Sequence, residues 1–225
     1  MSNTPVNAPL KAKATEFGQT GKFVIDNQKS LIFIGATIVI LIAGYFSYQK
    51  FYLAPREVEA TNQMYVAQDF WEKKDWDKAI KGDPPYPGFE KIISEYGNTK
   101  AANLAYFYLG TAYLNKGEFR KAIDNLTSFR GDDIIVTSEA FGETGDAYVE
   151  LKEYDKAETY FKKAADKAKN DFSSPFYLKK LGLVYDAEKD YRSAIDTFKK
   201  IKTDYPNSTE SQTIDEYISR DEAKL

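Results

Sequence analysis

Hydrophobic positions divide the chain into two parts with different patterns. From Leu31 to Tyr48 there are eighteen residues without a charge, bracketed by Lys29 and Lys50. Beyond residue 60, apolar residues recur at helical spacing instead, as pairs of stripes separated by short polar turns. The pattern predicts an all-α chain in which one long apolar helix is followed by a series of amphipathic helix pairs.

The uncharged segment predicts a transmembrane helix over residues 30–53. At about 1.5 Å of rise per residue, this length matches a hydrocarbon core of roughly 30 Å. Aromatic residues at its end, including Tyr48, Phe51 and Tyr52, are typical of the interface between membrane and water. The residues expected to form the membrane anchor are Leu31, Ile32, Phe33, Ile34, Ile38, Val39, Ile40, Leu41, Ile42, Tyr45 and Phe46.

A cleavable signal peptide is the alternative explanation of this segment. Such a peptide needs a short basic stretch and a cleavage site of small residues, whereas here 29 residues precede the segment and bulky aromatics follow it. We therefore expect a retained signal anchor. Lys11, Lys13, Lys22 and Lys29 precede it, which predicts that the tail over residues 1–29 stays in the cytosol and the rest is exported.

A sequence repeat with a period near 34 residues fills the C-terminal part. Its three clear units span about residues 103–136, 138–171 and 175–208. In each unit a glycine and an alanine leave room for close helix contact, and a tyrosine fills the space beside them. These residues are Gly110, Tyr113 and Ala122 in the first unit, Gly145, Tyr148 and Ala157 in the second, and Gly182, Tyr185 and Ala194 in the third.

The repeats extend beyond these three units at both ends. A degenerate unit over about residues 60–97 precedes them and is interrupted by a proline and glycine loop at 81–88. A capping helix and tail over residues 208–225 follow, with the N-cap expected at Ser208 or Thr209. The repeat domain is thus expected to cover residues 54–207.

The repeated residues resemble tetratricopeptide repeats over about residues 60–207. The resemblance implies a solenoid of about four helix pairs that binds protein, with the unpacked positions of each first helix lining a groove. Transferred by register, these positions are Leu104, Phe107, Thr111, Leu114 and Asn115, then Glu139, Gly142, Asp146, Val149 and Glu150, then Phe176, Lys179, Leu183, Asp186 and Ala187.

The groove positions are mostly apolar, with acidic insertions. This composition suits an amphipathic helix or an unfolded apolar segment, and the acidic residues disfavour the acidic tails that some tetratricopeptide co-chaperones bind. Neighbouring helices of the chain itself could instead cover several of these side chains. The loop residues Pro84, Pro85, Tyr86 and Pro87 also have two interpretations, a tolerated insertion or a stiff contact loop that presents Tyr86.

The amino-acid composition limits the catalytic and binding chemistry that the chain can perform. The chain has no cysteine and no histidine, so disulfides, thiolate metal sites and imidazole catalysis are excluded, and we expect neither an enzyme nor a cofactor. Five of the 31 Lys and Arg and two of the 34 Asp and Glu lie in residues 1–54, which leaves 26 against 32 beyond. That acidic balance disfavours nucleic acid.

A short segment before the apolar helix carries a second resemblance. The residues Phe23-Val24-Ile25-Asp26-Asn27-Gln28-Lys29, with the anchor and the exported repeats, are similar to the YfgM family. This resemblance implies an ancillary subunit of the SecYEG translocon in the bacterial inner membrane, with periplasmic repeats that work beside a PpiD-type membrane-anchored chaperone. Two alternatives stay open: a structural scaffold for an envelope or division complex, and an organelle import receptor with cytosolic repeats.

Overall fold

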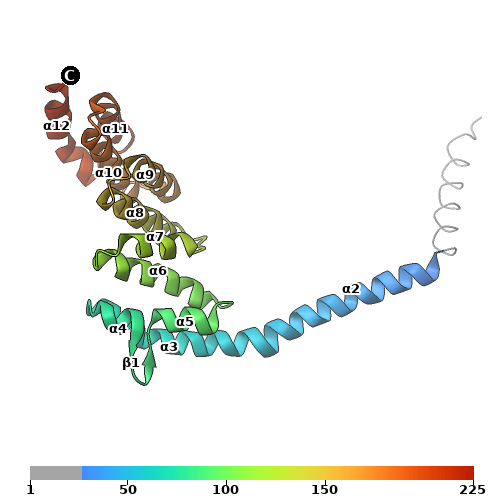
Figure 1. Cartoon of the computed structure of the whole chain (residues 1–225). Helices are drawn as coiled ribbons and strands as arrows, with labels where there is room; N and C mark the ends of the chain where they lie inside the picture. The colour runs from blue at the N-terminus through green and yellow to red at the C-terminus, as the bar shows by residue number, and fades with distance from the viewer. Residues whose placement is uncertain (1–26) are drawn as a thin grey trace, which may run out of the picture. The chain divides into compact units, whose positions relative to one another are not determined.

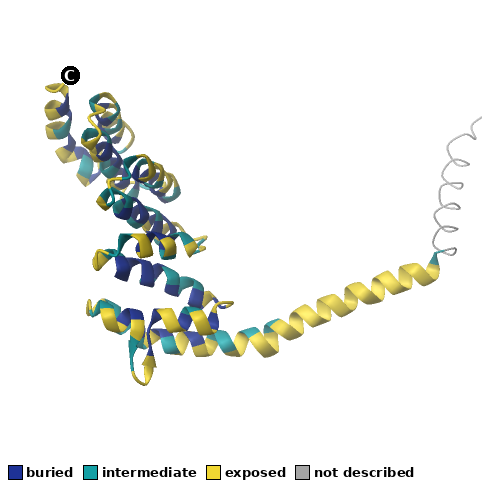
Figure 2. Cartoon of the chain, in the orientation of Figure 1, coloured by how far each residue is buried: buried dark blue, intermediate teal, exposed yellow. Residues whose placement is uncertain are grey.

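The computed structural model describes residues 27–225 and contains two compact units, one ending at Pro55 and one comprising Arg56–Leu225. In the first, helix α2 (Gln28–Tyr48) is followed by a π-helical turn η1 (Gln49–Leu53). No residue of α2 is buried (Figure 2). The helix that contains α2 is long and apolar enough to cross a membrane. The tail lysines Lys11, Lys13 and Lys22 lie outside the described residues.

The second unit is an all-α solenoid. It begins with α3 (Ala54–Glu72), α4 (Trp76–Lys81) and α5 (Phe89–Tyr96). Helix pairs then stack in chain order and end on the single helix α12 (Thr209–Glu222) (Figure 1). The pairs are α6 (Lys100–Asn115) with α7 (Phe119–Ser128), α8 (Ile134–Glu150) with α9 (Tyr154–Ala168), and α10 (Ser173–Ala187) with α11 (Tyr191–Asp204).

Small residues set the close contact within each pair, as the repeat pattern predicts. A Cβ atom added at Gly110 would lie 2.6 Å from Cγ of Leu126, and one at Gly145 would lie 2.7 Å from Cε1 of Phe161. These distances are too short for any side chain, so only glycine allows the second helix to pack this closely. The alanines Ala122, Ala157 and Ala194 are fully buried on the opposing helices.

The turns inside the helix pairs share one backbone conformation. Lys74, Gly117, Lys152 and Lys189 all adopt positive φ, between 58° and 75°. In the turn between α8 and α9, the backbone N–H of Lys152 donates to the carbonyl of Val149 and that of Glu153 donates to the carbonyl of Tyr148. This arrangement satisfies carbonyls at the helix C-terminus, and a left-handed residue is required to make it.

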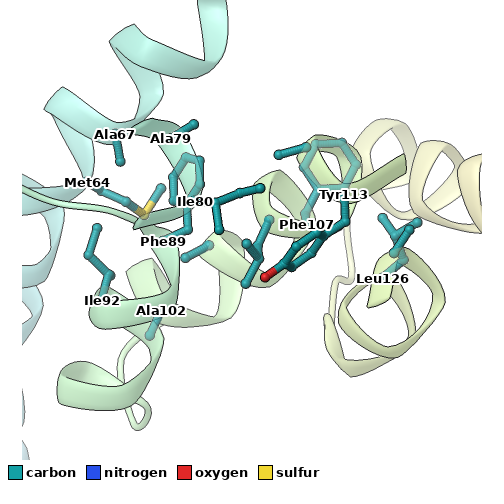
Figure 3. Packing of buried hydrophobic residues seen from close by; sticks show 14 of the residues in the cluster. Met64, Ala67, Ala79, Ile80, Phe89, Ile92, Ala102, Phe107, Tyr113 and Leu126 are labelled. Carbon is teal, nitrogen blue, oxygen red and sulfur yellow. The ribbon is translucent and has the colours of Figure 1, made fainter. Parts of the chain in front are cut away.

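The first repeat unit differs most from the others. Figure 3 shows Phe89 of α5 and Ile80 of α4 packed in the buried cluster with Met64 of α3. The segment 81–88 was predicted to be non-helical, but Lys81 belongs to α4. The remainder forms a small hairpin, β1 (Gly82–Asp83) and β2 (Tyr86–Pro87), in which Asp83 pairs with Tyr86. The hairpin is an addition to an otherwise helical fold.

Side chains cap several helix N-termini in the solenoid, including those of α12 and α6. The hydroxyl of Ser208 accepts a hydrogen bond from the backbone N–H of Ser211 at 3.1 Å, which starts α12 at one of the two predicted positions. At α6, the carboxylate of Glu57 in α3 accepts from the backbone N–H groups of Lys100 and Ala101 at 2.7 and 2.9 Å. This long-range cap joins α3 to the N-terminus of α6, the first helix of the pair α6 and α7.

Candidate partner-binding cleft

A hollow lies between α8, α10 and the start of α12. We call it the α8–α10 cleft, and its volume is about 590 Å³. First helices of two successive repeats form its walls, which is where the sequence predicts a groove. Its lining residues are Ile135, Ser138, Glu139, Glu143, Asp146, Asp171, Phe172, Ser173, Phe176, Tyr177, Lys180, Asn207, Ser208, Thr209 and Glu210.

Polar contacts fix the floor of the α8–α10 cleft. Nζ of Lys180 lies 2.7 and 2.6 Å from the two carboxylate oxygens of Asp146, which joins α10 to α8. The hydroxyl of Thr111 in α6 donates to the carboxylate of Glu143 at 2.5 Å. These contacts join α6, α8 and α10, which belong to three successive repeats.

Burial changes the acidity of two carboxyl groups in the α8–α10 cleft. Burial raises the pKa of Glu143 to about 8, although the hydrogen bond from Thr111 opposes the change and the nearby charges of Glu139 and Asp146 add to it. Burial also raises the pKa of Glu139. At neutral pH, Glu143 therefore holds a proton in a large share of molecules, and a cation placed beside it would favour the charged form.

Apolar side chains form the rim of the α8–α10 cleft. Ile135 at the start of α8 is 76% exposed, Phe172 before α10 is 86% exposed, and Phe176 within α10 is 44% exposed. Tyr177 lies deeper, and burial followed by the surrounding carboxylates raises its pKa to about 12. Large exposed apolar residues beside a hollow are typical of a surface that meets another protein.

A smaller hollow of about 300 Å³ continues from the cleft along α8 and α10. Asp146 and Lys180 line both hollows, so their ion pair separates the two. Of the predicted groove residues, Val149, Leu183 and Ala187 line this second hollow, and Glu139, Asp146 and Phe176 line the first. Glu150 lies on the exposed surface of α8.

The predicted groove residues of the α6 unit lie mostly against other parts of the chain. Phe107 and Thr111 are each only 6% exposed, and Thr111 is bonded to Glu143. Leu104 and Leu114 are half-buried against the hydrophobic cluster. Asn115 is exposed at the end of α6, where its amide donates to the carbonyl of Thr111. Little of this unit is left for a partner to contact.

Three other predicted groove positions are engaged within the chain. Asp186 accepts from Arg220 of α12 and from Lys224 just after α12, each at 2.7 Å. Nζ of Lys179 lies 4.9 Å from the ring of Tyr217 in α12. These contacts hold the capping helix on α10. Gly142 is buried beneath the ring of Tyr177.

Several residues of the α8–α10 cleft were not identified from the sequence. Tyr177 and Lys180 occupy α10 positions outside the transferred register, and Ile135 and Phe172 lie where turns join the helices. The sequence does contain a signal for Ile135 and Phe172, because a bulky apolar residue in a polar turn is not needed to fill the core and so indicates a contact surface. Nothing in the sequence indicates that the start of α12 would line the cleft.

The hairpin loop exposes Pro84, Pro85 and Tyr86 of the four predicted contact residues. Tyr86 is 51% exposed, whereas Pro87 is buried, and the peptide bond between Pro84 and Pro85 is cis. Nζ of Lys78 lies 2.7 Å from the carboxylate of Asp83 at the base of the hairpin.

Across residues 27–225, no three acidic residues lie close enough together to hold a metal ion.

Comparisons with protein families agree with this fold. One tetratricopeptide-repeat family model matches residues 107–175 and a second matches residues 180–208. With the stacked helix pairs and the glycine contacts, these matches show an all-α fold of tetratricopeptide-repeat type. That fold is typically a scaffold for protein interaction. A comparison with curated proteins gave no match.

Solved structures of tetratricopeptide type are similar to this one. A crystal structure of the MamA protein aligns with a TM-score of 0.56 at 21% identity, over 73% of this chain and 82% of that chain. A tetratricopeptide repeat protein from Parabacteroides merdae aligns with a TM-score of 0.58 at 17% identity, over 73% of this chain and 60% of that chain. At these identities, the similarity concerns the fold alone.

Proposed function

We propose that this chain is a membrane-anchored protein-interaction module whose α8–α10 cleft holds a segment of a partner protein. The observation that supports it is the juxtaposition of a hollow of about 590 Å³ with the exposed side chains of Ile135, Phe172 and Phe176. Burial of such side chains by a partner contributes roughly 25 cal/mol for each Å² of apolar surface removed from water. Helix α2, which buries no residue within the chain, serves as the anchor.

The partner proposed is the export machinery of the bacterial inner membrane. The similarity of residues 23–29 to the YfgM family supports a place beside the SecYEG translocon and a PpiD-type chaperone, acting on emerging envelope proteins. Only Asn27, Gln28 and Lys29 of that segment fall in the part that the structure describes. In this proposal the repeats are periplasmic and residues 1–29 are cytosolic.

Crosslinking in native membranes, followed by mass spectrometry, tests the identity of the partner. We expect translocon subunits and a periplasmic chaperone among the crosslinked proteins. Recovery of envelope-resident assembly or division proteins, without contact to nascent chains, would favour the structural scaffold instead. A result with neither group would contradict the proposal.

Cysteine labelling tests the orientation, because the natural chain contains no cysteine and needs no background substitutions. Lys200→Cys places a single thiol on the exposed surface of α11, and Thr15→Cys places one in the tail. We expect a membrane-impermeant maleimide to label Lys200→Cys in cells with a permeabilised outer membrane, and to leave Thr15→Cys unlabelled until the inner membrane is opened. The reverse pattern would indicate cytosolic repeats, as in an import receptor.

A further inference from the structure

The wall of the α8–α10 cleft is strongly acidic. Five acidic residues and one lysine line it. Lys180 is already paired with Asp146 at 2.6 Å. Within residues 27–225, no lysine or arginine forms an ion pair with Glu139, Asp171 or Glu210. The cleft therefore presents uncompensated negative charge to a ligand.

The backbone turn that carries Phe172 on the rim of the α8–α10 cleft is held by hydrogen bonds. Oδ1 of Asn170 accepts hydrogen bonds from the backbone N–H groups of Phe172 and Ser173 at 3.0 and 2.7 Å, which orders the turn that carries Phe172. Phe176 lies one helical turn further on, with Nζ of Lys180 4.9 Å from its ring. Because the backbone of this turn is already ordered, it loses little conformational entropy when a partner covers the rim.

We propose that the α8–α10 cleft selects a partner segment that carries lysine or arginine beside bulky apolar side chains. The inference rests on the proposed function and adds the chemistry of the ligand. In the proposed complex, the cationic groups of the partner lie against Glu139 and Asp171, and its apolar groups cover Phe172 and Ile135. An acidic segment is repelled by the same wall, so the charge of the partner decides specificity while its apolar groups supply affinity.

Peptide probes test this selectivity with the full chain in nanodiscs of zwitterionic lipid. The first probe is a short fluorescein-labelled peptide with lysine and leucine at helical spacing. The second probe carries glutamate in place of lysine, and the third carries serine in place of leucine. We expect fluorescence anisotropy, corrected with empty nanodiscs, to show binding of the first probe only. Raising the salt from about 50 mM to about 500 mM should weaken it, because screening acts on exposed charges.

Two pairs of substitutions locate the binding. Glu139→Gln with Asp171→Asn should weaken binding of the lysine probe about tenfold. Phe172→Ser with Ile135→Ser should weaken it by a similar factor, about tenfold. The matched control is Asp124→Asn with Asp166→Asn, which removes two exposed carboxylates on α7 and α9 outside the cleft and should change binding by less than about twofold. All replaced side chains are solvent-exposed, and circular dichroism checks the fold.

Three results would overturn the inference. The first is equal binding of the lysine and glutamate probes, and the second is binding that neither cleft pair weakens. The third is a dimer, seen by light scattering, that Phe172→Ser with Ile135→Ser dissociates, since a second copy would then be the occupant. If partners still crosslink through the α8–α10 cleft in membranes while the probes fail, the ligand chemistry is wrong and the proposed function stands.

Discussion

Lys180 in α10 and Asp146 in α8 form an ion pair across the floor of the α8–α10 cleft, with Nζ 2.7 and 2.6 Å from the two carboxylate oxygens. Both side chains are about one-third exposed, so water screens the attraction in part. In a double-mutant cycle with Asp146→Asn and Lys180→Met, measured by urea denaturation, we expect a coupling free energy of about 1 kcal/mol. A coupling free energy of zero would mean that the pair does not join the two repeats.

Glu143 gives the stability of the repeat domain a pH dependence of defined sign. Folding raises its pKa from the ordinary value of 4.5 to about 8. Its contribution to stability is therefore complete below pH 4.5 and is lost as the pH rises through 8. We expect the free energy of unfolding to fall over this window, by about 1.4 kcal/mol per pH unit at the steepest.

Glu143→Gln should remove most of this slope, measured by urea denaturation across the same pH window. Glu139, Asp146 and Lys180 face Glu143, and the pKa of Glu139 is raised by burial, so a smaller slope of the same sign should persist. An unchanged slope in the variant would show that Glu143 does not titrate in this window.

Gly145→Ala tests the contact between the helices of one repeat. The added Cβ would lie 2.7 Å from Cε1 of Phe161, whose side chain is 1% exposed. We expect a loss of about 1–3 kcal/mol in the free energy of unfolding. Gly44→Ala in α2 is the control, because no atom lies within 4 Å of its added Cβ, and it should leave the unfolding transition of the repeats in place.

Replacing the lysines of the inter-helix turns by glycine should increase the stability of the repeat domain. Lys152 and Lys189 have φ of 58° and 66°, a left-handed conformation that disfavours any residue with a Cβ. Lys152→Gly and Lys189→Gly should each raise the free energy of unfolding by about 0.5–1 kcal/mol. Lys200→Gly, in the interior of α11, should lower it by about 1 kcal/mol, so the same replacement acts with opposite sign in the two settings. Destabilisation at both turns would contradict this explanation.

The sequence predicts the solenoid well because its signals are local and repeated. Gly110 and Gly145, with their partners on the second helices, mark where helices touch, and one period gives the register of the whole array. The cap that Glu57 places on α6 was not predicted, because it joins residues 43 and 44 positions apart and follows no repeated spacing. Such contacts depend on how the first unit lies on the second.

The candidate site was harder to predict than the fold. Transfer by register assumes that each first helix offers the same surface, but Phe107 and Thr111 are buried. Asp186 is held by α12 instead of facing open space. End effects of this kind depend on which element follows each repeat, and a repeat pattern contains no information about them. Exposed apolar residues in the turns, such as Phe172, were the better guide.

Site-specific photocrosslinking in native membranes tests the central claim most directly. A photoreactive phenylalanine analogue is placed at Phe172 and Phe176 on the α8–α10 cleft, and at Lys200 on the exposed surface of α11 as the control. We predict that both cleft positions form adducts with the same partner protein and that position 200 forms none. Adducts of equal yield from position 200, or no adduct from either cleft position, would contradict the claim that this cleft is the binding surface.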